Sequence, residues 1–172
     1  MLLTVGDSFT YGTELTNQLN AWPYQLAERL GVQCTNLAEP GASNDFILRT
    51  TVEGIRTYNP SIVVVAFTTP DRFELNREHY TPNRNPREFM RWDSEWADSK
   101  FRVQVELLER YIQCEYYFLS PWDCVIEDSP QCIGQLVEFC EGFDKGEKGH
   151  PLIQGHTNIA KRVYDCIMTA RP

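Results

Sequence analysis

Apolar and polar positions follow two different periods along the chain. Short runs rich in apolar and β-branched residues predict strands at 2–5, 33–36, 62–67 and 116–119. Between them, apolar residues recurring every three or four positions predict helices near 21–31, 44–58, 99–112 and 155–168. Because strands alternate with helices, the pattern indicates an α/β fold around a parallel sheet. The nearly unbroken apolar run at 62–67 is typical of a strand covered on both faces.

Residues that start or stop helices support these boundaries. Pro23 falls in the first turn of a helix that Gly31 ends, and Pro60 follows the end of the next helix. Ser99 is the predicted cap of the third helix.

Two segments interrupt the alternation, at 70–98 and 120–149. The first carries prolines and aromatic residues and starts where the 62–67 strand ends, so it is a candidate lid or substrate wall. The alternative is that its aromatic residues only anchor the loop to the core. Arg72 and Glu74 could pair in its first turn. In the second segment, residues 133–139 fit either a short helix or a fifth strand.

Length and charge limit the classes of function. The chain has 172 residues, which predicts a single domain over 1–172, and its formal net charge is −8. That charge argues against nucleic acid or an anionic membrane surface as the main partner, since both would be repelled. The densest basic group is flanked by acids and is interpreted as solvated surface: Arg84, Arg87 and Arg91.

The lack of a recognisable targeting signal and the spacing of the cysteines both favour a reducing compartment. No apolar run approaches the ~18 residues of a membrane span, and the residues after Met1 are needed as a strand rather than as a signal peptide. We therefore expect a cytoplasmic protein without a membrane partner. The six cysteines include no Cys-x-x-Cys pair, which predicts reduced thiols and no structural zinc site.

One serine follows the first strand directly, in Gly6-Asp7-Ser8. Backbone N–H groups at such a strand-to-turn position can be unpaired and can stabilise an oxyanion. The tripeptide by itself also fits an ordinary turn, which Asp7 would hold through backbone hydrogen bonds. A catalytic interpretation therefore depends on the partners of Ser8 elsewhere in the chain.

A nucleophilic serine needs a histidine, which in turn needs an acid to orient it. His150 lies in a loop before the last predicted helix and has Glu147 three residues before it. His79 is interpreted as a surface residue and His156 as a packing or capping residue of the last helix. Since loops at the carboxyl ends of parallel strands share one sheet edge, the loops carrying Ser8, Gly41 and Thr69 should converge.

These motifs together resemble the SGNH/GDSL hydrolase family. Its first block matches Gly6-Asp7-Ser8, and its last resembles His150-Pro151 ahead of a final helix, with Glu147 where the family has Asp and Asp144 as a second candidate acid. The segment 36–44 matches the second block and puts Gly41 at the oxyanion glycine. The third block, Gly-x-Asn-Asp in the family, lacks its Asn here, and Thr69 is the nearest polar residue.

The resemblance implies a three-layer α/β/α sandwich with a mostly parallel, flavodoxin-like sheet and a serine esterase activity. It implies Ser8 as nucleophile, His150 as base and Glu147 as orienting acid. The oxyanion hole would comprise the N–H groups of Ser8 and Gly41, assisted by Thr69. No metal or cofactor is implied, and the substrate class is a small-molecule or carbohydrate acyl ester. Short members with this opening also resemble sequences carried by tailed phages.

Two other classes stay open. The missing Asn favours a catalytically weakened binding or structural module with the same fold. A flavodoxin-like binder of a phosphorylated ligand would cradle the anion with residues 8–12. Neither a glycine-rich phosphate motif nor a nearby Lys or Arg in the sequence supports that second class.

Overall fold

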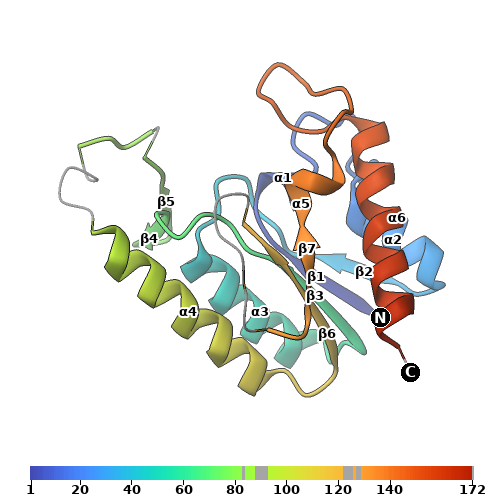
Figure 1. Cartoon of the computed structure of the whole chain (residues 1–172), viewed down its shortest axis with the longest axis horizontal. Helices are drawn as coiled ribbons and strands as arrows, with labels where there is room; N and C mark the ends of the chain where they lie inside the picture. Colours follow the sequence, from blue (N-terminus) through green and yellow to red (C-terminus); the bar gives the residue numbers. More distant parts are fainter. Residues whose placement is uncertain (83, 88–92, 122–125, 127–128, 172) are drawn as a thin grey trace.

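A five-stranded parallel sheet forms the centre of the molecule (Figure 1). The computed structural model describes residues 1–82, 84–87, 93–121, 126 and 129–171. The strands stand in the order β2-β1-β3-β6-β7, and every neighbouring pair is parallel. Their bounds are Leu2–Val5 (β1), Cys34–Asn36 (β2), Ile62–Ala66 (β3), Glu115–Ser120 (β6) and Cys132–Gln135 (β7). This is the flavodoxin-like order, so the predicted α/β fold class is confirmed.

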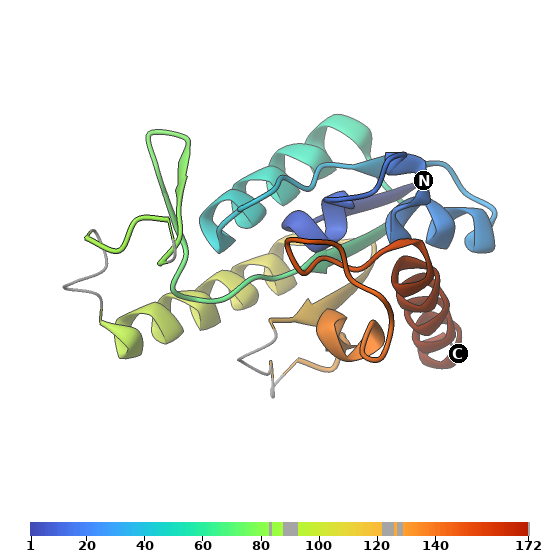
Figure 2. The ribbon, with the colours of Figure 1, turned by 90° about the horizontal axis from the view of Figure 1, so that it is seen from above.

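Helices cover both faces of the sheet (Figures 1 and 2). On one face lie α2 (Trp22–Leu30), α5 (Leu136–Phe139) and α6 (Ile153–Ala170), and on the other lie α3 (Asn44–Tyr58) and α4 (Ser94–Tyr111). Two short helices, α1 (Ser8–Tyr11) and η1 (Gln18–Asn20), complete the path between β1 and α2. No helix among the described residues is both long and apolar enough to cross a membrane.

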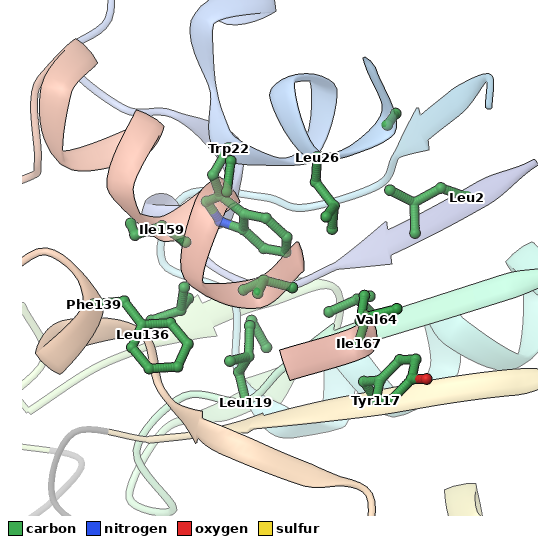
Figure 3. Packing of buried hydrophobic residues seen from close by; sticks show 14 of the residues in the cluster. Leu2, Trp22, Leu26, Val64, Tyr117, Leu119, Leu136, Phe139, Ile159 and Ile167 are labelled. Atoms are coloured by element: carbon green, nitrogen blue, oxygen red, sulfur yellow. The ribbon is translucent and has the colours of Figure 1, made fainter. Parts of the chain in front are cut away.

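Each face of the sheet has its own hydrophobic core. On the α2–α6 face, Trp22 and Ile159 are fully buried and pack over Val64 and Leu119 (Figure 3). On the opposite face, the ring of Phe67 lies edge-on against Phe101 and Phe118, with centroids 5.3 and 5.2 Å apart. A fully buried Leu or Ile side chain contributes about 1.5–3 kcal/mol. Burial on both faces explains why β3 has an unbroken apolar sequence.

Helix α4 begins earlier than the sequence predicted. It starts at Ser94, and the Asp93 carboxylate caps it by accepting the Trp96 N–H at 3.1 Å. Ser99, the predicted cap, lies inside the helix. Asp and Ser are both good N-caps, and the buried stripe extends to Ala97, one turn before Phe101. The prediction for α3 was correct at both ends.

The two irregular segments contain more regular structure than predicted. Residues 133–139 combine both alternatives, because β7 passes directly into α5. In the first segment, β4 (Phe73–Leu75) and β5 (Glu78–Tyr80) form an antiparallel hairpin, with Phe73 and Tyr80 stacked at 4.9 Å. Asn76 and Arg77 between them have φ of 53° and 68°, the backbone of a tight hairpin turn. The aromatic residues Phe89 and Trp92 lie outside the described residues.

The cysteines are unpaired where the structure describes them: Cys34, Cys114, Cys132, Cys140 and Cys166 are free. Burial raises the pKa of Cys34 to about 11, so this thiol stays protonated at neutral pH. Cys124 lies outside the described residues.

Candidate active site

Ser8 is the first residue of α1, immediately beyond the carboxyl end of β1. The Asp7 carboxylate caps this turn, since its Oδ1 accepts the Phe9 N–H at 3.1 Å. Gly6 is required because a Cβ there would lie 2.4 Å from the Thr10 hydroxyl oxygen. Asp7 therefore holds the turn as the sequence predicted, and the serine sits at a sharp strand-to-helix junction.

Asp7 also ties the ends of two neighbouring strands together. Its Oδ2 accepts hydrogen bonds from the Thr68 hydroxyl and from Arg72 Nη1, each at 3.1 Å. Both side chains of the ion pair are largely buried, with 4% of Asp7 and 14% of Arg72 exposed. The expected pairing of Arg72 with Glu74 is therefore wrong: Glu74 binds Arg49 at 3.0 Å. A buried carboxylate needs such donors, which explains the choice of partner.

His150 is oriented by an acid from the other end of the chain. Its Nδ1 lies 2.9 Å from Oε2 of Glu14. Glu14 also accepts the backbone N–H groups of Lys148, at 2.8 Å, and of His150, at 3.1 Å. The Lys148 N–H bond is the main cause of the lowered pKa of Glu14, so this acid is ionised at neutral pH.

The predicted acids lie elsewhere in the His150 loop. Glu147 and Asp144 are both exposed, and Glu14 occupies the position beside Nδ1 that the sequence interpretation gave to Glu147. Figure 1 shows how this happens: the loop before α6 reaches over the loop that follows α1. Glu14 and His150 are 136 positions apart in the sequence, so no local spacing could have revealed the pair.

The predicted serine, glycine, threonine and histidine come together in one pocket of about 580 Å³, called here the Ser8 pocket. Its lining comprises Ser8, Thr13, Pro40, Gly41, Thr69, Asp71, Arg72, Thr81, Pro82, Arg84, Lys148 and His150. The Phe9 ring contacts the imidazole of His150, with centroids 5.4 Å apart. A smaller pocket of about 270 Å³ lies at the opposite, amino end of β6.

Two backbone N–H groups in this lining lack intramolecular acceptors. Within the part of the chain that the structure describes, neither Ser8 nor Gly41 donates its N–H to another residue. Gly41 has φ of 82°, a left-handed conformation that favours glycine. Such N–H groups are the usual donors to an oxyanion.

Thr69 is held in the pocket lining by the strand end before it. The Asn44 side chain accepts the Thr68 N–H at 3.0 Å and donates to the Thr68 carbonyl at 2.8 Å. The side chain of Thr68 is turned inward to Asp7, which leaves Thr69 in the lining. The third predicted donor thus reaches the same pocket as Ser8 and Gly41.

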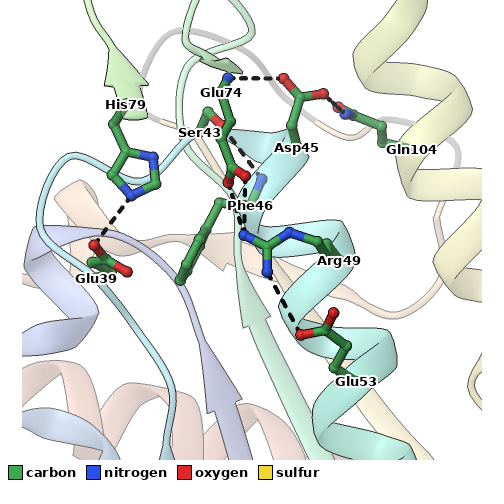
Figure 4. Close-up of polar contacts among 9 residues, drawn as sticks. All are labelled: Glu39, Ser43, Asp45, Phe46, Arg49, Glu53, Glu74, His79 and Gln104. Carbon is green, nitrogen blue, oxygen red and sulfur yellow. Dashed lines mark hydrogen bonds and ion pairs between the residues drawn. The ribbon is translucent and has the colours of Figure 1, made fainter. Parts of the chain in front are cut away.

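The other two histidines have structural environments. His156 is fully buried, and its Nδ1 accepts the Trp22 N–H at 3.2 Å, so it packs as predicted. Burial, with a smaller contribution from the nearby His150, lowers the pKa of His156 to about 4. His79 is not a surface residue: only 11% of its side chain is exposed, and it contacts Phe46 and lies 3.4 Å from Glu39 (Figure 4).

The hairpin containing His79 is anchored to the start of α3. Asp45 accepts the Glu74 N–H at 3.3 Å and the Gln104 amide at 2.8 Å, while Arg49 pairs with Glu74 (Figure 4). Lys100 adds a further bond to Asp45 at 2.8 Å. The hairpin is therefore attached to α3, and Asp45 in turn links α3 to α4. Segment 70–98 is thus anchored by polar contacts, and its residues 71, 72, 81, 82 and 84 also line the Ser8 pocket, as the substrate-wall alternative expected.

Among solved structures, several match this chain over nearly its whole length. A protein of the G-D-S-L family from Desulfitobacterium hafniense has a TM-score of 0.68 at 13% identity, covering 96% of this chain and 98% of its own. Esterase EstA from Pseudoalteromonas gives 0.66 at 13% identity, covering 98% and 96%. Acetylxylan esterase Axe2 from Geobacillus stearothermophilus gives 0.59 at 14% identity, covering 96% and 93%.

The chain has the SGNH/GDSL hydrolase fold. No family model and no curated protein matches the sequence. At such low identity the likeness establishes the fold alone. The SGNH/GDSL fold agrees with the resemblance that the sequence motifs carry, and the Ser8 pocket lies at the carboxyl edge of its sheet.

Sequence reasoning missed several residues of the Ser8 pocket region, Asp71 and Lys148 among them. Glu14 and Arg72 are recognisable only through their partners, His150 and Asp7. Arg84, interpreted as solvated surface, is exposed but also lines the pocket. Of the other members of that basic group, Arg87 is exposed, and Arg91 lies outside the described residues.

Proposed function

We propose that this protein is a serine esterase that hydrolyses an acyl ester through an acyl-serine intermediate. One observation carries the proposal. Four separate segments contribute residues to the lining of one pocket: Ser8, Gly41, Thr69 and His150. The Glu14 carboxylate is hydrogen-bonded to Nδ1 of that histidine. This is the constellation that a nucleophilic serine requires.

In the proposed reaction, Glu14 accepts the Nδ1–H of His150 and thereby leaves Nε2 free to take a proton. His150 removes the proton of the Ser8 hydroxyl as the oxygen attacks the ester carbonyl. The tetrahedral intermediate collapses, and the imidazolium gives its proton to the departing alcohol. A water deprotonated by His150 then attacks the acyl-serine, releases the acid and restores Ser8.

The oxyanion would be held by the N–H groups of Ser8 and Gly41, with the Thr69 hydroxyl as third donor. A hydroxyl rotates and is shorter than the amide of an Asn, so it is less preorganised. Loss of one oxyanion donor typically costs about 100- to 1,000-fold in rate. We therefore expect turnover slower than that of an enzyme with all three donors fixed.

The substrate class is inferred from the volume of the pocket and from a protein of similar fold. A volume of about 580 Å³ is that of a small-molecule site. One protein of similar fold is an acetylxylan esterase, which makes short acyl groups on small molecules or carbohydrates the first substrates to test.

The proposal is tested with a fluorophosphonate probe and with p-nitrophenyl acetate. Wild-type protein should be labelled and should turn over the ester, and Ser8→Ala should lose both while remaining folded. Ser99→Ala, an exposed serine of α4, is the matched control and should behave as wild type. Absence of labelling in folded wild-type protein would contradict the proposal and favour a binding module with this fold.

A further inference from the structure

Cationic side chains gather in the Ser8 pocket although the chain has a net charge of −8. The lining contains Arg72, Arg84 and Lys148 against one carboxylate, that of Asp71. Arg72 is paired with Asp7 at 3.1 Å. Arg84 and Lys148 form no ion pair with any residue the structure describes, so their charges are available to a ligand.

These two cations lie next to the proposed catalytic groups. A Cβ on Gly41 would stand 3.6 Å from Arg84 Nη1, so the guanidinium lies beside the proposed oxyanion glycine. Lys148 is two residues before His150, and its backbone N–H donates to Glu14. One cation therefore neighbours the oxyanion side of the pocket, and the other neighbours the histidine side.

Asp71 restricts where an anion could bind. Its Oδ1 is buried and has no hydrogen-bond partner among the described residues. A carboxylate in that state repels a nearby anion and favours a donor such as a hydroxyl. An anionic group would therefore be held away from Asp71, between the two unpaired cations.

We propose that the esters this pocket accepts carry an anionic group, a carboxylate or a phosphate, which Arg84 and Lys148 bind. The inference rests on the proposed esterase function and deepens it. Guanidinium and ammonium groups form charge-assisted hydrogen bonds with both anions, and Arg does so in a bidentate manner. The two side chains would determine specificity and would take no part in the bond-breaking steps.

The test compares matched anionic and neutral esters. In the first set the charge is on the alcohol part of the ester: 4-acetoxybenzoate and 4-acetoxyphenyl phosphate are compared with neutral 4-acetoxybenzamide. In the second set the charge is on the acyl part: methyl hemisuccinate is compared with neutral methyl butyrate by pH-stat titration. These arms distinguish carboxylate from phosphate and identify which half of the ester carries the charge.

The decisive quantity is the ratio of kcat/KM for the anionic ester to that for its neutral partner. We expect Arg84→Gln and Lys148→Gln each to lower this ratio about fivefold to tenfold, because the loss falls mainly on the anionic ester. Arg87→Gln removes an exposed arginine that does not line the pocket, and it should leave the ratio unchanged. Added salt should reduce the wild-type preference.

Two failures are distinguishable. If no ester is turned over and Ser8 is not labelled, the esterase function itself is wrong. If neutral esters are turned over but the ratio in Arg84→Gln and Lys148→Gln stays within twofold of wild type, only the anionic substrate class is wrong. An equal loss on anionic and neutral esters would also overturn it, because the cations would then serve the oxyanion generally.

Discussion

Replacing Glu14 by Gln tests which acid orients His150: Glu14, which lies beside its ring in the structure, or Glu147, which the sequence suggested. The substitution keeps the length of the side chain and removes only its charge. In the structure, Oε1 accepts the Lys148 N–H and Oε2 accepts both the N–H and Nδ1–H of His150. An amide cannot accept at both positions, so one of the two groups of contacts must be lost.

Either orientation of the Gln amide impairs the histidine. If the NH₂ faces His150, it donates to Nδ1 and enforces the tautomer with a proton on Nε2, which cannot accept the Ser8 proton. If the NH₂ faces Lys148, two donors oppose each other and the loop is displaced. In both cases the imidazolium also loses its neighbouring negative charge. Neutralising the acid of such a triad lowers kcat by about 100- to 10,000-fold.

The assay is kcat for p-nitrophenyl acetate between pH 5 and 9, with urea unfolding to show that the variant is folded. Glu147→Gln is the matched control: this carboxylate is exposed three residues before His150, and its loss should change kcat less than twofold. If Glu14→Gln kept kcat within threefold of wild type, or if Glu147→Gln were the damaging variant, the assignment of Glu14 would be refuted.

Two stability predictions follow from buried polar groups. His156 has a pKa of about 4 in the folded protein against about 6.5 unfolded, so its contribution to stability is complete above about pH 6.5 and is lost as the pH falls towards 4. Urea unfolding should show about 2 kcal/mol more destabilisation between pH 7 and pH 5 in wild type than in His156→Gln, and parallel pH profiles would contradict this. Asn44→Ala leaves the Thr68 N–H and carbonyl unpaired and should lower the free energy of unfolding by about 1–3 kcal/mol. A loss below about 0.5 kcal/mol in Asn44→Ala would show that these two hydrogen bonds contribute little.

Local patterns were sufficient for most of the fold. The β-branched run before Phe67 specified a doubly covered strand, and helix α3 was predicted at both ends, with Pro60 marking where it stops. In the structure, Ser43 and Asn59 cap this helix. The sequence placed the start of α4 too late because Asp93 and Ser99, six positions apart, are both suitable N-caps. Burial of Ala97 favours the earlier start. Such choices depend on packing against the sheet, which no local pattern contains.

For the candidate site, the predicted strands were enough to place Ser8, Gly41 and Thr69 at one sheet edge, because parallel strands end there. Which charges meet depends on how the chain folds. Glu14 contacts His150, 136 positions away in the sequence, and Arg72 pairs with Asp7 although Glu74 is closer in sequence. The physical reason is that a buried charge binds whichever partner the folded chain brings within hydrogen-bond distance, and that proximity is set by how loops cross rather than by spacing.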